Sequence, residues 1–297
     1  MAAKLTVHAT LFTDPGCPWA YSARPALARL NWRFGDQLEW KLVLIGLSET
    51  TERYDAIGYT PARQAAGWAN FQRRFGMPFG RVPKPRLAPT TRACRAIIAA
   101  REIDPDLSEA ALLALQLLQF TTTGLLDNDD DLRGALARVD GLNAEAIVAK
   151  IDYPEVVSLY EADKALARTA EGTPLHVQDR HSTSDGPVRY TAPSVIFEYD
   201  GERADVGGFQ PFESYDNALA NLAPGLERRA APSDPAEALA AFPHGLTTAE
   251  VAAAMRPTDL AEEDTADASR RLIALAHDGA VMGEQVGTDA FWRAAKS

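Results

Sequence analysis

"LFTDPGCPWAYSARPAL", residues 11–27, joins an apolar run to a segment with helical character and is the most informative stretch of the chain. Pro18 predicts a helix that starts directly after Cys17, because proline is favoured at the first helical position, where its missing N–H has no partner. The thiol of Cys17 would then face the unpaired N–H groups at the positive end of that helix. Three residues further on, where a second cysteine would complete a dithiol pair, Ala20 offers only a methyl group.

A cysteine in this position is predicted to be a reactive nucleophile. The helix dipole stabilises a thiolate, so we expect the pKa of Cys17 to lie below the free value of about 8.5 and well below that of Cys94. The thiolate is the attacking species in disulfide exchange and in thiol conjugation. The alternative is a buried cysteine that fills core space, which is the commoner role of cysteine in proteins. A Gly-Cys-Pro-Trp turn between a strand and a helix favours the functional interpretation.

The composition is that of an ordinary globular protein of 297 residues, with a net charge of −11 and a pI near 5.0. An acidic surface repels phosphate backbones and anionic lipid heads, so we expect neither a nucleic acid nor a membrane as partner. The first residues alternate as in a strand and lack the apolar core of a signal peptide, which favours a cytoplasmic location. The two cysteines are too few for a disulfide scaffold.

Hydrophobic patterning predicts strands at both ends of a long helical block. Pro25 is expected to kink the helix that begins at Pro18, and Ser108 and Asp129 or Asp130 are expected to cap later helices. The dipeptide at 200–201 indicates a hairpin turn. The predicted elements are strands at 4–13, 38–47 and 192–199, helices at 18–31 and 212–222, and helices through most of 61–168. This order predicts a discontinuous α/β domain, residues 1–60 and 171–225, into which an all-helical domain, residues 61–170, is inserted.

Residues 232–297 are predicted to form a separate small unit that resembles a winged helix-turn-helix. Thr247 or Thr248 with Glu250 indicates a capped helix, a longer helix ends at Gly279, and a strand–turn–strand follows. The unit carries five basic residues against eleven acidic ones, which argues against DNA binding. A packing or dimerisation role is the preferred interpretation, and a homodimer is one possible state.

Pro193 lies at the start of an apolar strand, where a proline must occupy the first residue or an edge. A cis Ala192–Pro193 bond would leave backbone groups of Ala192 free to pair with an extended thiol ligand. An ordinary trans proline in a loop is the commoner arrangement, and the sequence leaves both open.

Taken together, these features resemble the DsbA branch of the thioredoxin superfamily. "DPGCPWAYSARPAL" is similar to the D-x-x-CPWCY segment of FrnE-like proteins, which are related to kappa-class glutathione transferases and 2-hydroxychromene-2-carboxylate isomerases. "RLAPTTRACRAIIAA" is similar to the insert helix that covers the active site in these families. "TAPSVIFEYDGERADVGGFQPFESYDNAL" resembles their cis-proline hairpin and the helix after it. The resemblance covers about residues 4–222 and implies a thioredoxin fold with a large helical insertion.

The resemblance implies a site built around Cys17. Its predicted substrate- and thiol-binding residues are Asp14, Pro18, Trp19, Tyr21, Ala192 and Pro193. Because Ala20 replaces the family's second cysteine, the chain is expected to act as a monothiol enzyme whose adduct is resolved by a low-molecular-weight thiol such as glutathione, with no tightly bound cofactor. Cys94, on the covering helix, is a possible resolving thiol, although a buried core residue is the preferred interpretation.

Three functions remain open at this point, in order of preference. The first is a DsbA-like thiol-disulfide oxidoreductase with Cys17 as its single active-site cysteine. The second is a glutathione-transferase-like or isomerase-like enzyme that acts on a small molecule, since these relatives carry serine where Cys17 stands. The third is a non-catalytic, degenerate thioredoxin-fold binding module. The scattered histidines and the absence of CxxC, HExxH or glycine-rich phosphate motifs predict neither a metal nor a nucleotide site.

Overall fold

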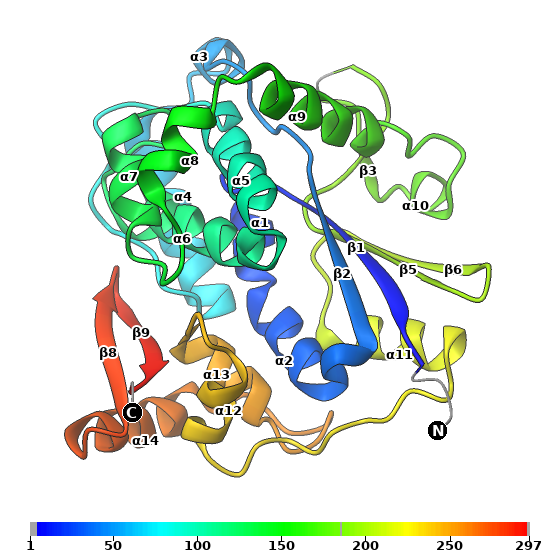
Figure 1. Cartoon of the computed structure of the whole chain (residues 1–297), viewed down its shortest axis with the longest axis vertical. Coiled ribbons are helices and arrows are strands. Elements are labelled where there is room, and N and C mark those ends of the chain that lie inside the picture. Colours follow the sequence, from blue (N-terminus) through cyan, green and yellow to red (C-terminus); the bar gives the residue numbers. More distant parts are fainter. Residues whose placement is uncertain (1–4, 185, 296–297) are drawn as a thin grey trace.

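The computed structural model describes residues 5–184 and 186–295, and it has a mixed α/β architecture (Figure 1). A four-stranded sheet contains β1 (Val7–Thr13), β2 (Leu38–Leu44), β5 (Ser194–Tyr199) and β6 (Glu202–Gly207). Its strand order is β2-β1-β5-β6. Strand β1 runs parallel to β2 and antiparallel to β5, and β5 and β6 form a hairpin. Strand β1 therefore lies in the middle of the sheet, with Cys17 just beyond its carboxyl end.

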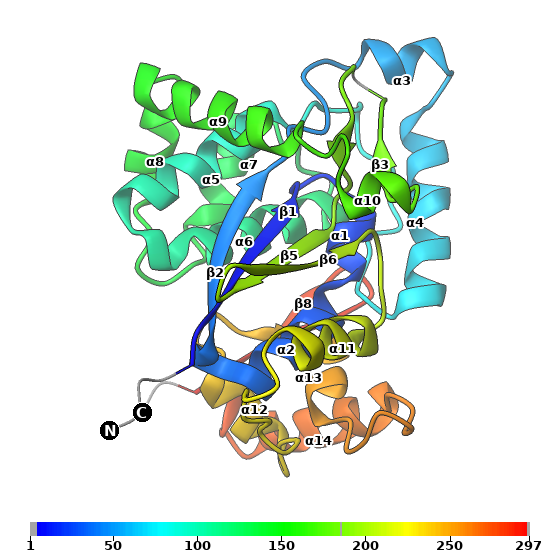
Figure 2. The ribbon, with the colours of Figure 1, turned by 90° about the vertical axis from the view of Figure 1, so that its right-hand side faces the viewer.

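Successive side chains of β1 point to opposite faces of the sheet, and both faces are covered. One face packs against α2 (Arg24–Phe34) and α11 (Phe212–Leu222), with Val7, Val195 and Phe197 in a shared core. On the other face Phe12 joins Val43, Ile196 and residues around Ala167. Figure 2 shows α2 and α11 together below the sheet and α9 (Pro154–Ala167) above it. This arrangement fixes the junction between β1 and the helix after it.

A block of helices connects β2 to the second half of the sheet. It comprises α3 (Glu52–Ala56), α4 (Pro61–Phe75), α5 (Thr91–Ile103), α6 (Ser108–Thr121), α7 (Asp129–Leu136), α8 (Ala144–Lys150) and α9. Helix α6 is buried along most of its length, and the apolar residues of α5 and α6 form the centre of the largest core cluster, together with α7, α8 and α9. After α9, the short α10 (Pro174–Val177) and the pair β3 (His181–Ser182) and β4 (Arg189–Tyr190) lead into β5.

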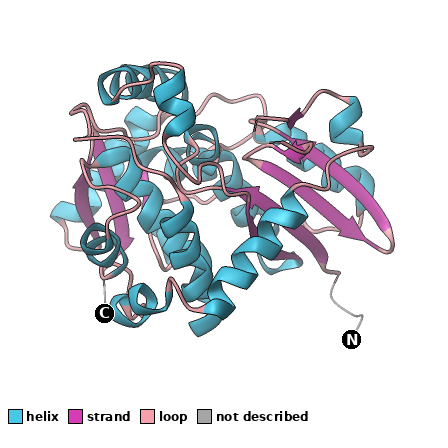
Figure 3. Ribbon diagram, turned by 90° about the horizontal axis from the view of Figure 1, so that it is seen from above, coloured by secondary structure: helices cyan, strands magenta, loops and turns pink. Residues whose placement is uncertain are grey.

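The last part of the chain forms a compact unit beside the helices. It contains α12 (Pro235–Ala241), β7 (Leu246–Thr247), α13 (Thr248–Met255), α14 (Thr265–His277), β8 (Val281–Val286) and β9 (Asp289–Ala294). The three strands pair in the order β7-β9-β8. Thr247 and Glu250 form a reciprocal capping box at the start of α13. Seen from above, this unit and the four-stranded sheet lie at opposite ends of the molecule, with helices between them (Figure 3).

The C-terminal unit is tied to α2 by a buried ion pair. Arg24 Nε donates to Glu250 Oε1 at 2.8 Å, and the Glu250 side chain is only 1% exposed. Arg24 also approaches Gln116 and Glu109 of α6, at 3.4 and 3.8 Å. The guanidinium of Arg24 therefore joins α2, the helical block and the C-terminal unit.

We expect Glu250→Ala to lower the free energy of unfolding by about 3–5 kcal/mol, because it removes the capping box and leaves the Arg24 cation without its buried partner. Urea denaturation followed by circular dichroism measures the change. Glu145→Ala is the matched control, since Glu145 is exposed and pairs with Arg133 at the surface, where an ion pair contributes at most about 1 kcal/mol. Equal effects of the two substitutions would contradict the assignment.

Several local predictions were wrong in detail. The break after Pro18 falls at Ala23 rather than at Pro25, which occupies an early position of α2. The hydroxyl of Ser108 donates to Pro105 O instead of capping α6. Asn128, and neither Asp129 nor Asp130, caps α7, because its side chain accepts from the Asp131 N–H. Only at the start of α7 does a neighbouring polar side chain replace the predicted cap, since the first turns of α2 and α6 have no side-chain cap.

Among the described residues, no helix combines the length and the apolar character that crossing a bilayer requires.

Candidate active site

Cys17 is the N-cap residue of α1 (Pro18–Ser22), and Pro18 occupies the first helical turn. The turn before it is held by the Cys17 N–H, which donates to Asp14 O at 3.2 Å, and the helix begins with the Tyr21 N–H donating to Cys17 O at 3.0 Å. The Cys17 side chain does not cap the helix by a hydrogen bond, but the backbone N–H groups of Trp19 and Ala20 lie close enough to lower the pKa of its thiol. This is the placement that the Cys-Pro sequence predicts.

The segment around Pro193, at the start of β5, lies opposite Cys17 and completes the site. The Ala192–Pro193 peptide bond is cis, and the Cys17 thiol donates to Ala192 O at 3.1 Å. These two residues are 175 positions apart, so the contact exists only because β5 pairs with β1. The prediction that Ala192 presents free backbone groups needs a correction, because the thiol of Cys17 itself occupies the carbonyl.

Burial reverses the predicted ionisation of the nucleophile. Cys17 is 5% exposed, and burial, with a smaller contribution from the nearby Asp14 charge, raises the pKa of its thiol to about 11. The N–H groups of Trp19 and Ala20 and the cation of Arg189 act in the opposite direction and do not outweigh burial. The expectation of a pKa below the free value was therefore wrong, and Cys17 is a protonated thiol at neutral pH. Burial likewise raises the pKa of Cys94 well above its ordinary range.

Asp14 is a fully buried carboxyl group beneath Cys17, and four donors surround it. Gly16 N donates to Oδ1 at 2.8 Å. Oδ2 accepts from the Leu47 N–H at 2.8 Å and from the Thr90 hydroxyl at 3.1 Å, and the Cys94 thiol lies 3.5 Å from it. Burial raises the pKa of Asp14, and these hydrogen bonds counteract the rise only in part. Asp14 thus influences Cys17 through its charge and through the turn that it stabilises, rather than as an exposed binding group.

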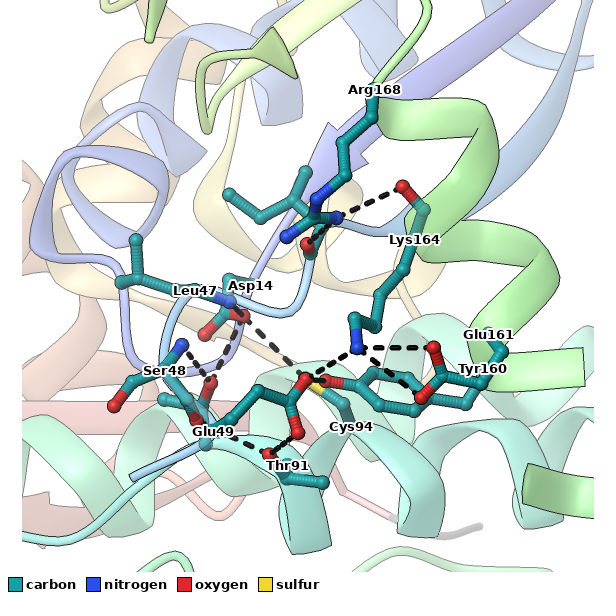
Figure 4. Close-up of polar contacts among 12 residues, drawn as sticks. Asp14, Leu47, Ser48, Glu49, Thr91, Cys94, Tyr160, Glu161, Lys164 and Arg168 are labelled. Carbon is teal, nitrogen blue, oxygen red and sulfur yellow. Dashed lines mark hydrogen bonds and ion pairs between the residues drawn. The ribbon is translucent and has the colours of Figure 1, made fainter. Parts of the chain in front are cut away.

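Behind Asp14, a polar network connects the buried carboxyl to the surface of α9 (Figure 4). The Tyr160 hydroxyl donates to Glu49 Oε1 at 2.7 Å, and Lys164 Nζ lies 2.8 Å from the same oxygen. Thr91 donates to Glu49 Oε2 at 2.8 Å. Together these contacts fix the loop after β2, which supplies the Leu47 N–H to Asp14, so the network supports the base of the site.

Cys94 lies on α5 with its side chain fully buried, and both cysteines are free thiols. Its sulfur is directed at Asp14, which also acts electrostatically on Cys17. A resolving role for Cys94 stays a prediction, since a 0% exposed thiol would have to leave its packing to reach an adduct on Cys17.

Two of the predicted substrate-binding residues on α1 lie in opposite environments. Trp19 is 42% exposed and borders the site. Tyr21 is fully buried, stacks on Phe120 at 4.7 Å and donates to Pro78 O at 3.0 Å. Its role is to pack α1 against the helical block, and the prediction that it contacts substrate is not supported. Ala20 is 3% exposed and lies in the same apolar cluster as Cys17.

Two polar residues of the site were missed by the sequence analysis. Arg189 is 3% exposed, donates to Tyr190 O at 3.0 Å, and its cation favours the Cys17 thiolate. Thr90, at the N-terminal end of α5, gives its hydroxyl to Asp14 instead of to its own helix. Neither residue lies in a recognisable motif. For Thr90 the available signal was its place in the Pro-Thr-Thr sequence directly before a helical pattern, and Arg189 had no signal.

A sizeable cavity lies away from the thiol. It has a volume of about 740 Å³ and lies between α2, α6 and the C-terminal unit, and none of the predicted site residues lines it. Within the described ranges, no group of three histidine, cysteine, aspartate or glutamate side chains is arranged to hold a metal ion.

No family model matches the chain, and no curated protein gives a significant sequence match. Solved structures do match. A chain of Nitrosomonas europaea, provisionally assigned as a protein disulfide isomerase, aligns with a TM-score of 0.55 at 15% identity, over 73% of this chain and 97% of its own. A probable DsbA oxidoreductase from Streptomyces coelicolor aligns with a TM-score of 0.54 at 19% identity, over 72% of this chain and 89% of its own.

Both similarities concern the overall arrangement of the sheet and the helices. The predicted α/β fold is thereby confirmed at the level of its architecture. The fold of the chain is therefore similar to that of the probable DsbA oxidoreductase from Streptomyces coelicolor.

Proposed function

We propose that this chain is a thiol-disulfide exchange enzyme in which Cys17 is the only active-site nucleophile. The observation that carries the proposal is the pairing of the Cys17 sulfur with Ala192 O, 3.1 Å apart, beside Pro193 and at the start of a helix. A core cysteine needs no such surroundings. Ala20 excludes an internal disulfide within the Cys-Pro-Trp-Ala segment, so the chemistry is that of a monothiol.

The exchange takes place in two balanced steps. Cys17 releases its proton to solvent, and its thiolate attacks one sulfur of a substrate disulfide. A mixed disulfide forms as the substrate S–S bond breaks, and the second sulfur leaves as a thiolate that takes up a proton from solvent. A low-molecular-weight thiol then attacks the substrate sulfur of the adduct, and Cys17 is released as a thiolate. The incoming thiol thus resolves the mixed disulfide, which in a dithiol site is the role of the second cysteine.

Substrate binding is expected to activate the buried thiol. A backbone N–H of the substrate that donates to Ala192 O would displace the Cys17 proton from its acceptor. The sulfur would then retain the donors that favour a thiolate, namely the N–H groups of Trp19 and Ala20 and the cation of Arg189. Asp14 holds the turn before Cys17 in place during this change, through its bonds to Gly16 and Leu47.

We expect Cys17→Ser to abolish adduct formation with a small disulfide such as oxidised glutathione, at least about 1000-fold, because a serine hydroxyl cannot exchange with a disulfide. Intact-protein mass spectrometry after incubation measures the adduct. Cys94→Ala is the matched control and should retain it, since Cys94 is fully buried. An adduct that persists in Cys17→Ser and disappears in Cys94→Ala would assign the reactive thiol to α5 instead.

A binding module without catalysis is the second candidate, and the burial of Cys17 with its raised pKa favours it. Absence of any Cys17 adduct in the wild-type chain, even after prolonged incubation at about pH 9, near the ordinary pKa of a thiol, would support this candidate over the enzyme.

A further inference from the structure

Positive charge is concentrated in one segment of this acidic chain. Between Ala56 and Arg101 there are nine basic residues and no acidic one, although the net charge of the whole chain is −11. Five of the nine have internal roles. Four arginines pair with aspartates of other elements, and a buried lysine donates to carbonyl groups at the end of α6; these five are Arg86, Arg92, Arg95, Arg101 and Lys84.

The other four basic residues of this segment are exposed: Arg63, Arg73, Arg74 and Arg81. In the part of the chain that the structure describes, none of these four forms a salt bridge. Arg63 and Arg74 are eleven residues apart on α4, close to three full turns, so they lie on one face of the helix. A cationic face without internal carboxylates is suited to bind an anion from outside.

Helix α4 stands directly beside the site. Trp19, two residues after Cys17, contacts two rings of α4, with centroid distances of 4.8 Å to Phe71 and 5.6 Å to Phe75. Phe209 completes the group, 5.8 Å from Trp19 and 4.5 Å from Phe75. Figure 2 shows α4 upright next to α1, at the edge of the molecule.

The same rings connect both sides of the thiol. Trp19 belongs to the helix that begins at Cys17. Phe209 follows β6, whose last residue Gly207 pairs with Ser194, the neighbour of Pro193. The aromatic wall of Trp19, Phe75 and Phe209 therefore borders the site from the cysteine side and from the proline side. The guanidinium of Arg74 lies 5.1 Å from the centre of the Phe75 ring, so it is next to this wall.

We infer that Arg74 and the aromatic wall form a subsite for the carboxylate-bearing arm of a small disulfide or thiol whose sulfur reaches Cys17. The inference rests on the proposed exchange chemistry and names its substrate class. The wall offers ring faces to an apolar or planar arm, and Arg74 offers a fork of donors to a carboxylate. A small molecule fits better than a folded partner, because Cys17 is only 5% exposed and admits a narrow sulfur-bearing arm.

The test compares two aromatic disulfides that differ in charge: dithiobis(nitrobenzoate), with a carboxylate on each ring, and neutral dithiodipyridine. In both reactions the Cys17 thiolate forms a new S–S bond, the probe disulfide breaks, and the other half leaves as a coloured thiolate or thione. Stopped-flow absorbance gives the second-order rate constants in a Cys94→Ala background. We expect Arg74→Gln to slow the anionic probe about fivefold to tenfold and the neutral probe less than about twofold.

Three controls make the result specific. Arg74→Lys should restore part of the rate, since it keeps the charge and loses the fork. Arg73→Gln removes the same charge from the neighbouring residue of α4 and should slow the anionic probe by less than about twofold. The difference between wild type and Arg74→Gln should shrink at about 1 M salt, where charges are screened within about 3 Å.

Equal slowing of both probes by Arg74→Gln, or equal slowing of the anionic probe by Arg73→Gln and Arg74→Gln, would overturn the subsite and leave the exchange chemistry intact. Failure of both probes and of oxidised glutathione, which carries the amide N–H groups that the probes lack, to modify Cys17 in the wild-type chain would instead refute the proposed function itself.

Discussion

Ala20→Cys, made in a Cys94→Ala background, is expected to convert the protein from a monothiol into a dithiol exchanger. With alanine at position 20, an excess of dithiobis(nitrobenzoate) should release about one equivalent of coloured thiolate and leave the other half of the probe on Cys17. In the variant, the introduced thiol would attack that adduct, so about two equivalents would be released and an internal disulfide would remain. The substitution fits the site, because Ala20 and Cys17 already lie in one apolar cluster and the added atom is small.

Mass spectrometry separates the two outcomes, since the product with alanine at position 20 carries the probe and the variant product is two hydrogens lighter than its starting chain. Ala20→Ser, also in a Cys94→Ala background, is the matched control, because it adds one polar atom of similar size but no thiol. It should retain the probe. Retention of the probe by Ala20→Cys would show that the helix holds residue 20 too far from Cys17. The site would then differ from a dithiol site by more than the missing second sulfur.

The second large effect concerns pH. With the pKa of Cys17 near 11, the thiolate fraction rises about tenfold for each pH unit below that value. We therefore expect the iodoacetamide rate to increase about 1000-fold between about pH 7 and pH 10, without a plateau. Asp14→Asn should raise the rate at neutral pH about tenfold, because it removes a nearby negative charge that disfavours the thiolate.

The control for Asp14→Asn is Asp200→Asn, which removes the same charge from the exposed turn between β5 and β6 and should leave the rate unchanged. A thermal melt of Asp14→Asn at neutral pH checks that the fold survives the substitution. A plateau of the wild-type rate below about pH 9 would mean that the helix N-terminus outweighs burial, contrary to the raised pKa derived from the structure.

The elements that frame the site could be predicted from the sequence because their signals are local. Pro18 after Cys17 places the start of a helix, the Asp-Gly at 200–201 places the β5–β6 turn, and Thr247 with Glu250 marks the start of α13. Each of these depends on residues within one or two turns of chain. The predicted position of the thiol at a strand–helix junction followed from the same local rules.

The properties of the thiol itself could not be predicted in this way, because they arise from distant segments. Cys17 is buried by residues of α9, β4 and β5, and the donors around Asp14 come from the loop after β2 and from α5. Hydrophobic periodicity shows that such segments are buried but not which of them meet. The helix-dipole argument correctly predicts that the N–H groups at the start of α1 lower the pKa of Cys17. It gives no measure of burial, which raises this pKa by more.

The hydrogen bond from Cys17 to the Ala192 carbonyl has a further consequence, for the survival of the protein under oxidative stress. Peroxides oxidise thiolates that are open to solvent, first to sulfenic and then irreversibly to sulfinic acid. A cysteine that is protonated, almost completely covered and bonded to a carbonyl reacts slowly with such oxidants. In the proposed monothiol exchange no neighbouring active-site cysteine would rescue a sulfenic acid as a disulfide. A nucleophile that ionises only when a ligand arrives would therefore protect the one sulfur on which the proposed turnover depends.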